Sequence, residues 1–160
     1  MRQETLLFVV DRTQGKVLLG MKKIRFGAGK YNGMGGKVEE GETPAQAAVR
    51  ELAEEVGLVA APERTRMHGH IDFSFDKKPE WTRRVHVFVS DTWEGEPAES
   101  DEMAPEWFAF SDIPWERMWI DDIHWLPRVL GGEYIEAEFH FSNDGSKILH
   151  QDVRGRAHEA

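Results

Sequence analysis

Short apolar runs separated by polar or glycine-rich segments make up most of this chain, and this pattern is typical of β-strands. The runs predict strands at 5–10, 16–21, 67–75, 84–90, 105–110, 134–141 and 147–150. The first two strands flank the turn-forming residues 11–15, and the last two flank Asn143-Asp144-Gly145. We therefore expect a β-hairpin at each end of a sheet-rich domain.

A helix with well-marked ends follows a cluster of glycines. Thr43 is a suitable N-cap, Pro44 suits the first helical position, and Gln46 completes a capping box. Gly57 is expected to end the helix as a C-terminal cap. At the helical period the residues that share its apolar side are Ala45, Val49, Leu52 and Val56. This side is expected to pack inward.

A second helix is predicted from Asp121 or Asp122 to about Leu130, where Gly131-Gly132 ends it. Two helices against a mixed set of strands indicate an α/β or α+β sandwich. Residues 1–150 are expected to form a single domain. The polar residues 151–160 have the composition of a flexible C-terminal tail.

Composition and charge narrow the class of protein. The chain has 160 residues, 40% of them hydrophobic, which suits one globular domain. Its net charge of -9 argues against a long nucleic acid as partner. No cysteine is present, which excludes disulfides and thiolate metal sites. The apolar run 6–10 is too short for a signal peptide or membrane span, so we expect a cytoplasmic protein without membrane contact.

Three glutamates on the first helix are the strongest candidates for chemistry. Glu51, Glu54 and Glu55 are spaced i, i+3 and i+4, so their carboxylates cluster on one side. Arg50 is the only basic neighbour and cannot neutralise three acids. Hard oxygen ligands at this density suit Mg²⁺, for which Mn²⁺ can substitute. The alternative is an ordinary charged surface helix.

The segment from Gly36 to Leu58 carries a recognisable motif. It reads Gly36-Lys37-Val38-Glu39-Glu40-Gly41-Glu42, then seven residues, then Arg50-Glu51-Leu52-Ala53-Glu54-Glu55-Val56-Gly57-Leu58. This resembles a complete Nudix box. The resemblance implies the Nudix α/β/α sandwich with a mixed central sheet, and hydrolysis of a nucleoside diphosphate linked to another group. It makes the charged-surface alternative improbable.

Several roles follow from this resemblance alone. Glu51, Glu54 and Glu55 would be catalytic metal ligands, with Gly36 and, from a distant loop, Glu102 completing the metal site. Arg50 would belong to the catalytic residues as well, and its role would be to orient a glutamate. The glutamate that activates water differs among Nudix enzymes and stays unassigned.

Segments outside the box resemble the MutT-type branch of the family found in animals, which acts on oxidised purine nucleoside triphosphates. The match runs from Thr5 to Phe141. It implies base-recognition roles for Asn32, Asp121 and Asp122 and a stacking role for Trp119. Further substrate-binding residues would be Phe26, Phe73, Met103, Thr5 and Lys22. The chain departs from this branch at Tyr31, at Ile120 and at Arg83-Arg84, which has no counterpart there.

The two adjacent aspartates also have a simpler explanation. Asp121 or Asp122 at a helix start would stabilise the helix as an N-cap with no ligand present. Two neighbouring carboxyls beside an aromatic wall do not both ionise easily, so one of them can stay protonated and donate a hydrogen bond. One protonated and one ionised acid would together offer a hydrogen-bond donor and acceptors that recognise modified purines.

The expected function is therefore metal-dependent cleavage of purine nucleoside triphosphates, such as 8-oxo-dGTP, to the monophosphate and pyrophosphate. This reaction would remove oxidised nucleotides from the pool. Alternatives are hydrolysis of another nucleoside diphosphate derivative (a dinucleoside polyphosphate, ADP-ribose or a capped RNA end), or a nucleotide sensor without catalysis. The protein is expected to be a monomer.

Overall fold

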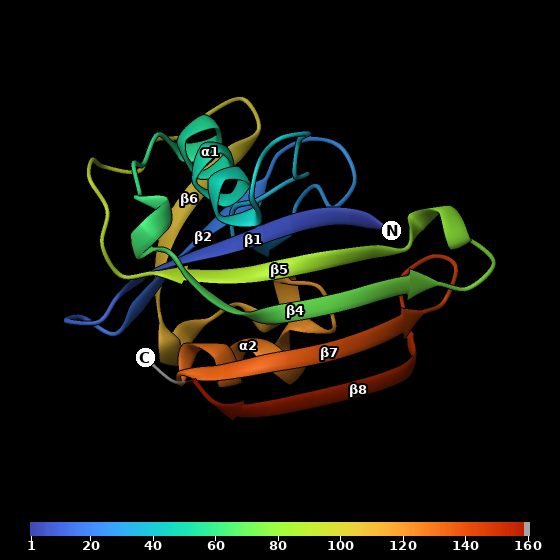
Figure 1. Cartoon of the computed structure of the whole chain (residues 1–160). Helices are drawn as coiled ribbons and strands as arrows, with labels where there is room; N and C mark the ends of the chain where they lie inside the picture. Colours follow the sequence, from blue (N-terminus) through green and yellow to red (C-terminus); the bar gives the residue numbers. More distant parts are fainter. Residues whose placement is uncertain (159–160) are drawn as a thin grey trace.

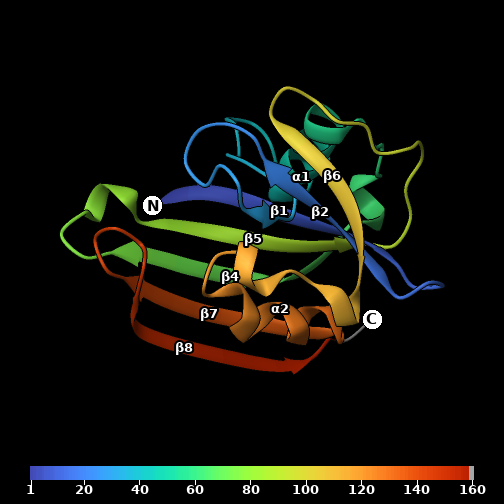
Figure 2. The ribbon, with the colours of Figure 1, turned by 180° about the vertical axis from the view of Figure 1, so that it is seen from behind.

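Strand β1 (Arg2–Asp11) is apolar on both faces, and each face packs on a different helix in the computed structural model, which describes residues 1–158. Leu7 and Val9 lie in one buried cluster with Leu52 of α1 (Pro44–Val56). Phe8 lies in a second cluster, where its ring meets Trp125 of α2 (Asp122–Leu130) edge-on at 5.9 Å. The sheet thus lies between two helices, which confirms the predicted sandwich (Figures 1 and 2).

The sheet is mixed, as expected. Its order is β3-β2-β1-β5-β4-β7-β8, with β6 paired to β2. β1 runs parallel to β5, and β4 parallel to β7, whereas the other pairs are antiparallel. The remaining strands are β2 (Lys16–Lys22), β3 (Tyr31–Asn32), β4 (Arg66–Phe75), β5 (Arg83–Ser90), β6 (Met103–Ala109), β7 (Glu133–Phe141) and β8 (Ile148–Ala157). Only the short β3, inside the glycine cluster, was not predicted.

Helix α1 has the ends that its sequence predicts. The Thr43 side chain accepts from Gln46 N–H, and the Gln46 side chain accepts from Thr43 N–H, which completes the capping box. Gly57 ends the helix with φ 74°, a left-handed conformation that glycine adopts without strain. The buried side differs slightly from the prediction, because Ala45 and Val49 are only half-buried. The buried residues are Ala47, Ala48, Leu52, Glu55 and Val56.

Helix α2 starts and ends where it was predicted, but its first residues do not cap it. Asp121 occupies the N-cap position with helical dihedrals, and its side chain makes no capping hydrogen bond. A side-chain cap by Asp121 is therefore absent, whereas Asp122 does lie in the first turn, as the alternative expects. Within residues 1–158, no helix combines the length and apolar character needed to cross a lipid bilayer.

The prediction of a flexible tail from residue 151 was wrong for most of that segment. Strand β8 continues to Ala157 and pairs along the whole of β7, from Phe141↔Ile148 to Glu133↔Ala157. Its side chains are mostly exposed, so the strand is held by its backbone ladder rather than by an apolar pattern that a sequence would reveal. Arg128 of α2 also donates to the Val153 carbonyl at 3.4 Å. Residues 159–160 lie outside the described part.

Deleting residues 151–160 tests this correction. Because the deletion removes most of the β7–β8 ladder and exposes β7 as the sheet edge, we expect the melting temperature to fall by about 5 °C or more. A variant lacking only residues 159–160 serves as control and should melt like the full chain. Equal melting temperatures for both truncations would show that β8 contributes nothing to stability.

Candidate functional site

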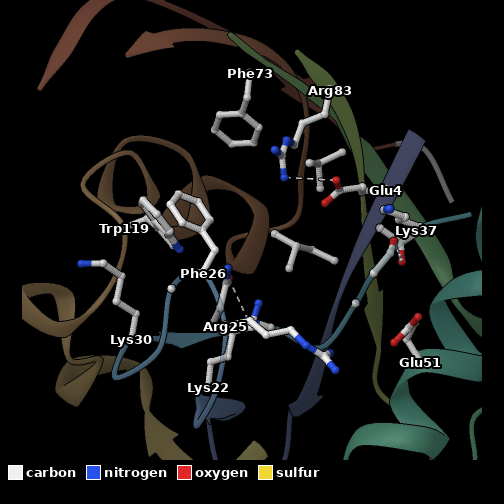
Figure 3. A pocket seen from close by; sticks show the side chains of 18 of the residues that line it. Glu4, Lys22, Arg25, Phe26, Lys30, Lys37, Glu51, Phe73, Arg83 and Trp119 are labelled. Atoms are coloured by element: carbon white, nitrogen blue, oxygen red, sulfur yellow. Dashed lines mark hydrogen bonds and ion pairs between the residues drawn. The ribbon is translucent and has the colours of Figure 1, made fainter. Parts of the chain in front are cut away.

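A cavity of about 740 Å³ opens between the glycine-rich segment that follows β2, the start of β5 and the residues before α2. Its lining comes from both sides of the sheet, since Glu51 and Glu55 belong to α1 and Asp122 belongs to α2. One end carries glutamates of α1, and the other carries Asp121 and Asp122 (Figure 3 shows part of the lining). The cavity therefore has two acidic ends joined by an aromatic and basic middle.

The glycines preceding α1 allow their backbone to lie directly against β1. Leu7 and Met34 exchange backbone hydrogen bonds of 2.7 and 3.1 Å, and Thr5 N–H donates to the Gly36 carbonyl at 2.8 Å. A Cβ atom on Gly35 would lie 1.8 Å from the Thr5 carbonyl oxygen, so no other residue fits there. A Cβ on Gly36 would lie 2.5 Å from Glu51 Oε1. This close approach brings Gly36 to the glutamate end of the cavity.

Three carboxylates line that end: Glu51 and Glu55 from α1, and Glu102 from the loop before β6. Burial raises the pKa of Glu55 to about 8, and repulsion from Glu51 adds to the effect. The Gly35 N–H donates to Glu55 at 3.1 Å and partly opposes this shift. Burial also raises the pKa of Glu51. Burial and mutual repulsion thus make the ionised forms of Glu51 and Glu55 unfavourable.

Arg50 holds one of these acids, Glu51, and does not face the cavity. Its guanidinium binds Glu42 through two hydrogen bonds of 2.8 and 3.0 Å. It also donates to Glu51 at 3.0 Å and to the Lys37 carbonyl at 3.1 Å. The sequence-based expectation that Arg50 orients a glutamate agrees with this geometry. Arg50 does not line the cavity.

Glu54 differs from the other two glutamates of the helix. Its side chain is 59% exposed, accepts from Arg50 at 3.2 Å and does not line the cavity. The structure therefore brings Glu51, Glu55, Glu102 and Gly36 together but leaves Glu54 at the outer side of the helix. Its predicted role as a metal ligand stays a prediction.

The carboxylates at this end suit a divalent cation by their chemistry, although they do not yet form a coordination sphere. Within residues 1–158 no three His, Cys, Asp or Glu side chains converge as metal ligands. Two of the acids form ion pairs with arginines instead: Glu51 with Arg50, and Glu102 with Arg25 at 3.6 Å. The raised pKa of Glu55 and the contact of Gly36 with Glu51 fit a site whose oxygens gather around a cation.

The opposite end holds two buried aspartates. Asp121 Oδ2 accepts from the indole N–H of buried Trp125 at 2.8 Å, which fixes this carboxylate. Burial raises the pKa of both acids, and repulsion from Asp121 helps to raise the pKa of Asp122 well above its usual range. Among residues 1–158 the buried Asp122 Oδ2 has no hydrogen-bond partner. The two carboxyls also hydrogen-bond each other, so this end combines a protonated acid with free acceptor oxygens.

Aromatic side chains form the walls near these aspartates. Trp119 and Phe26 lie with their ring centroids 5.1 Å apart, and Phe26 also lies 5.7 Å from Trp81. The Lys30 ammonium lies 5.2 Å from the Trp119 ring. Phe26 is 53% exposed, which is unusual for a phenylalanine and suits a surface that a flat ligand covers.

The other residues predicted to bind substrate also line the cavity: Thr5, Lys22, Asn32, Phe73 and Met103. Asn32 Oδ1 accepts from Gly33 N–H at 2.8 Å, which orients the amide and leaves its NH₂ group for a ligand. All the predicted substrate-binding residues therefore line this one cavity, whereas Arg50 and Glu54 do not, and the roles of all these residues stay predictions.

Sequence reasoning missed a charged part of the lining. Glu4 and Arg83 line the cavity beside Trp81 and were not proposed as site residues. Arg83 was noted only as a departure from related sequences. Period-two alternation along β5 places Arg83 on the same face as buried Val85 and Val87, and this pattern was the available signal.

The chain is similar to known proteins over most of its length. The model of the NUDIX domain matches residues 1–129. An oxidized purine nucleoside triphosphate hydrolase from Danio rerio is 48% identical, covering 92% of this chain and 91% of its own length. The Mus musculus protein of the same name is 45% identical, covering 96% of this chain and 94% of its own length. The crystal structure of a mutator MutT protein from Bacillus halodurans superposes with a TM-score of 0.83 at 26% identity, covering 96% and 97% of the chains.

The buried Asp122 predicts a pH dependence of stability. Its folded-state pKa is raised, so the stability that its proton provides is complete below the ordinary aspartate pKa of about 4 and is lost as pH rises toward the raised value. Asp122→Asn removes this loss. We expect the stability of Asp122→Asn relative to the unchanged chain to rise with pH, by at most about 1.4 kcal/mol per unit.

Urea unfolding at a series of pH values, with a chelator present, measures this difference. Exposed Asp91 provides the matched control, and Asp91→Asn should follow the unchanged chain at every pH. Parallel curves for Asp122→Asn and the unchanged chain would show that Asp122 is ionised in the folded protein.

Proposed function

Because the chain belongs to the NUDIX family, we propose that it is a divalent-metal-dependent pyrophosphohydrolase of oxidised purine nucleoside triphosphates. The products would be the nucleoside monophosphate and pyrophosphate, and 8-oxo-dGTP is the leading substrate. The animal relatives named for this activity align with nearly the whole chain. The observation that carries the proposal is the single cavity with carboxylates at one end and the buried aspartate pair at the other.

Glu51, Glu55 and Glu102 would hold Mg²⁺, with Mn²⁺ as a substitute, beside Gly36. When bound, such a cation would supply positive charge to the phosphates and lower the pKa of the attacking water. The chain itself keeps Glu51 in place through Arg50 and holds Gly36 against it through the glycine contacts with β1. Lys22 and Lys37 line the same region, and their ammonium groups would balance the charge of the phosphates.

Asp121, Asp122 and Asn32 would bind the edge of the purine, and Trp119 would stack on its face. Asp122 donates a hydrogen bond while protonated, Asp121 accepts, and the Asn32 amide does both. A mixed donor and acceptor set suits oxidised purines, because oxidation at C8 changes which ring and exocyclic atoms carry hydrogens. The burial of both acids makes an unmatched base costly, since a buried polar group without a partner is penalised.

Other expectations from the sequence stay predictions. A monomeric state and a cytoplasmic location belong to the proposed role in cleaning the nucleotide pool. The absence of long nucleic acid as a partner is expected from the net charge of -9.

A substrate panel tests the proposed reaction. Oxidised and ordinary dGTP and dATP are incubated with Mg²⁺, and the products are identified as pyrophosphate or phosphate. We expect pyrophosphate release with kcat/KM highest for an oxidised purine. Preference for ADP-ribose, a dinucleoside polyphosphate or a capped RNA end would replace the substrate class, and binding without turnover would indicate a sensor.

The raised pKa of Glu55 predicts that metal binding releases a proton. With a pKa of about 8, Glu55 is mostly protonated at neutral pH, and a cation that takes its carboxylate must displace that proton. Titration calorimetry with Mn²⁺ in two buffers of different ionisation enthalpy measures the release. Glu55→Gln should abolish it and lower kcat by about 100-fold or more, since even outer partners of metal ligands contribute about 10- to 100-fold.

Exposed Glu63 supplies the matched control, and Glu63→Gln should keep both the proton release and the rate. Glu54→Gln, assayed in parallel, decides whether Glu54 joins the ligands once metal is bound. Unchanged proton release in Glu55→Gln would remove Glu55 from the metal site.

A further inference from the structure

An ion pair forms part of the cavity wall near the aromatic side chains. Arg83 Nη1 lies 3.2 Å from Glu4 Oε2, and both side chains are largely buried, with exposures of 19% and 16%. Glu4 and Arg83 come from the adjacent parallel strands β1 and β5. Figure 3 shows the guanidinium beside Phe73, on the other side of the hollow from Trp119 and Phe26. The pair thus borders the base-binding half of the cavity, on the face of the sheet that carries α2.

Arg83 is held in one orientation. Its Nε donates to the Trp81 carbonyl at 3.1 Å, and its Nη1 donates to Glu4 at 3.2 Å. Within residues 1–158 these are its hydrogen bonds, so Nη2 keeps its donors for a ligand. A guanidinium fixed at two points presents a flat cationic plate at little entropic cost.

The wall keeps a positive charge despite the ion pair. Glu4 Oε2 forms a second ion pair with Arg2, whose Nε lies 2.7 Å away. One carboxylate is therefore shared by two arginines, Arg2 and Arg83, both of which line the cavity. The two arginines together exceed Glu4 by one positive charge at this wall, while Asp121 and Asp122 place acidic groups elsewhere in the lining.

We propose that Arg83 is a specificity-determining residue that forms the second face of the base site, opposite Trp119, and excludes purines carrying a positive charge. The inference rests on the proposed function, because it places a purine beside Trp119. The guanidinium plane stacks on the face of the purine, a cation–π contact that favours neutral oxopurines over cationic ones. A purine methylated at N7 is cationic and meets a like charge in a partly desolvated site, which is repulsive.

Replacing Arg83 is expected to weaken the use of a neutral oxidised purine and to strengthen the binding of a cationic one. Replacing Arg83 by Met keeps an apolar side chain of similar length but removes the charge and the plane. Arg83→Met should lower kcat/KM for 8-oxo-dGTP by about 3- to 30-fold, mainly through KM, as expected for loss of one cation–π contact. It should raise the affinity for 7-methyl-GMP at mildly acidic pH by a similar factor. Arg83→Lys keeps the charge and should still exclude 7-methyl-GMP.

Arg84 provides a matched control one residue away. It points to the other side of the sheet, binds Asp72 through hydrogen bonds of 2.8 and 2.9 Å, and does not line the cavity. Arg84→Met removes an equivalent charge and should leave the preference between the two ligands unchanged. Melting temperatures of all variants show that each one is folded.

Calorimetric binding of 8-oxo-dGMP and 7-methyl-GMP, measured without metal, separates this proposal from the proposed function. If the unchanged chain binds these monophosphates but hydrolyses no triphosphate, the reaction is wrong while the role of Arg83 is still decided by the two affinities. Equal changes for both ligands in Arg83→Met, or the same change in ratio for Arg84→Met, would overturn the role of Arg83. A reduced affinity for the neutral purine together with a gain for the cationic one supports it.

Discussion

The guanidinium of Arg50 connects the parts of the cavity that the chain brings from different segments. It contacts Glu42 and the Lys37 carbonyl in the segment before α1, and Glu51 and Glu54 on the helix itself. The pKa of Arg50 is raised, mainly because it donates hydrogen bonds to Glu42, and the pKa of Glu42 is lowered by the same contact. Without this cation, half-buried Glu51 would face buried Glu55 with no arginine to oppose their repulsion. The position of the glutamates thus depends on one side chain that does not itself line the cavity.

The backbone of the glycine segment makes the same arrangement possible from the other side. Gly35 and Gly36 lie so close to Thr5 and Glu51 that a single added carbon would collide with them. The segment therefore behaves as an extra strand-like edge on β1, although only Tyr31–Asn32 form a regular strand. Because β1 also carries Glu4, the same strand positions both the glutamate end and the charged wall near Trp119.

How much the sequence could predict depends on how local each signal is. The ends of α1 follow from Thr43, Gln46 and Gly57, which act on their own neighbours, and the Nudix box lies within one continuous segment. Strand β8 could not be predicted, since exposed polar side chains carry no periodic signal and its partner strand supplies the stabilising ladder. The orientation of Glu54 depends on which acids Arg50 reaches in space. The role of Arg83 emerges only when β1 and β5 are aligned side by side, because Glu4 lies far away in sequence.

The acids at both ends of the cavity lower the stability of the folded chain, and a ligand that pairs with them would offset this cost. Burial raises the pKa of Glu55 at one end and of Asp122 at the other, so each is held as a neutral acid that ionises less readily than it would in water. A cation at the first end relieves the repulsion between Glu51 and Glu55, while a base at the second end supplies the partner that Asp122 Oδ2 lacks among residues 1–158. A nucleoside triphosphate bound with its cation, as proposed, would reach both ends at once. The stability lost in burying these acids would then be recovered as binding energy, and fully so only when the base and the phosphates both fit.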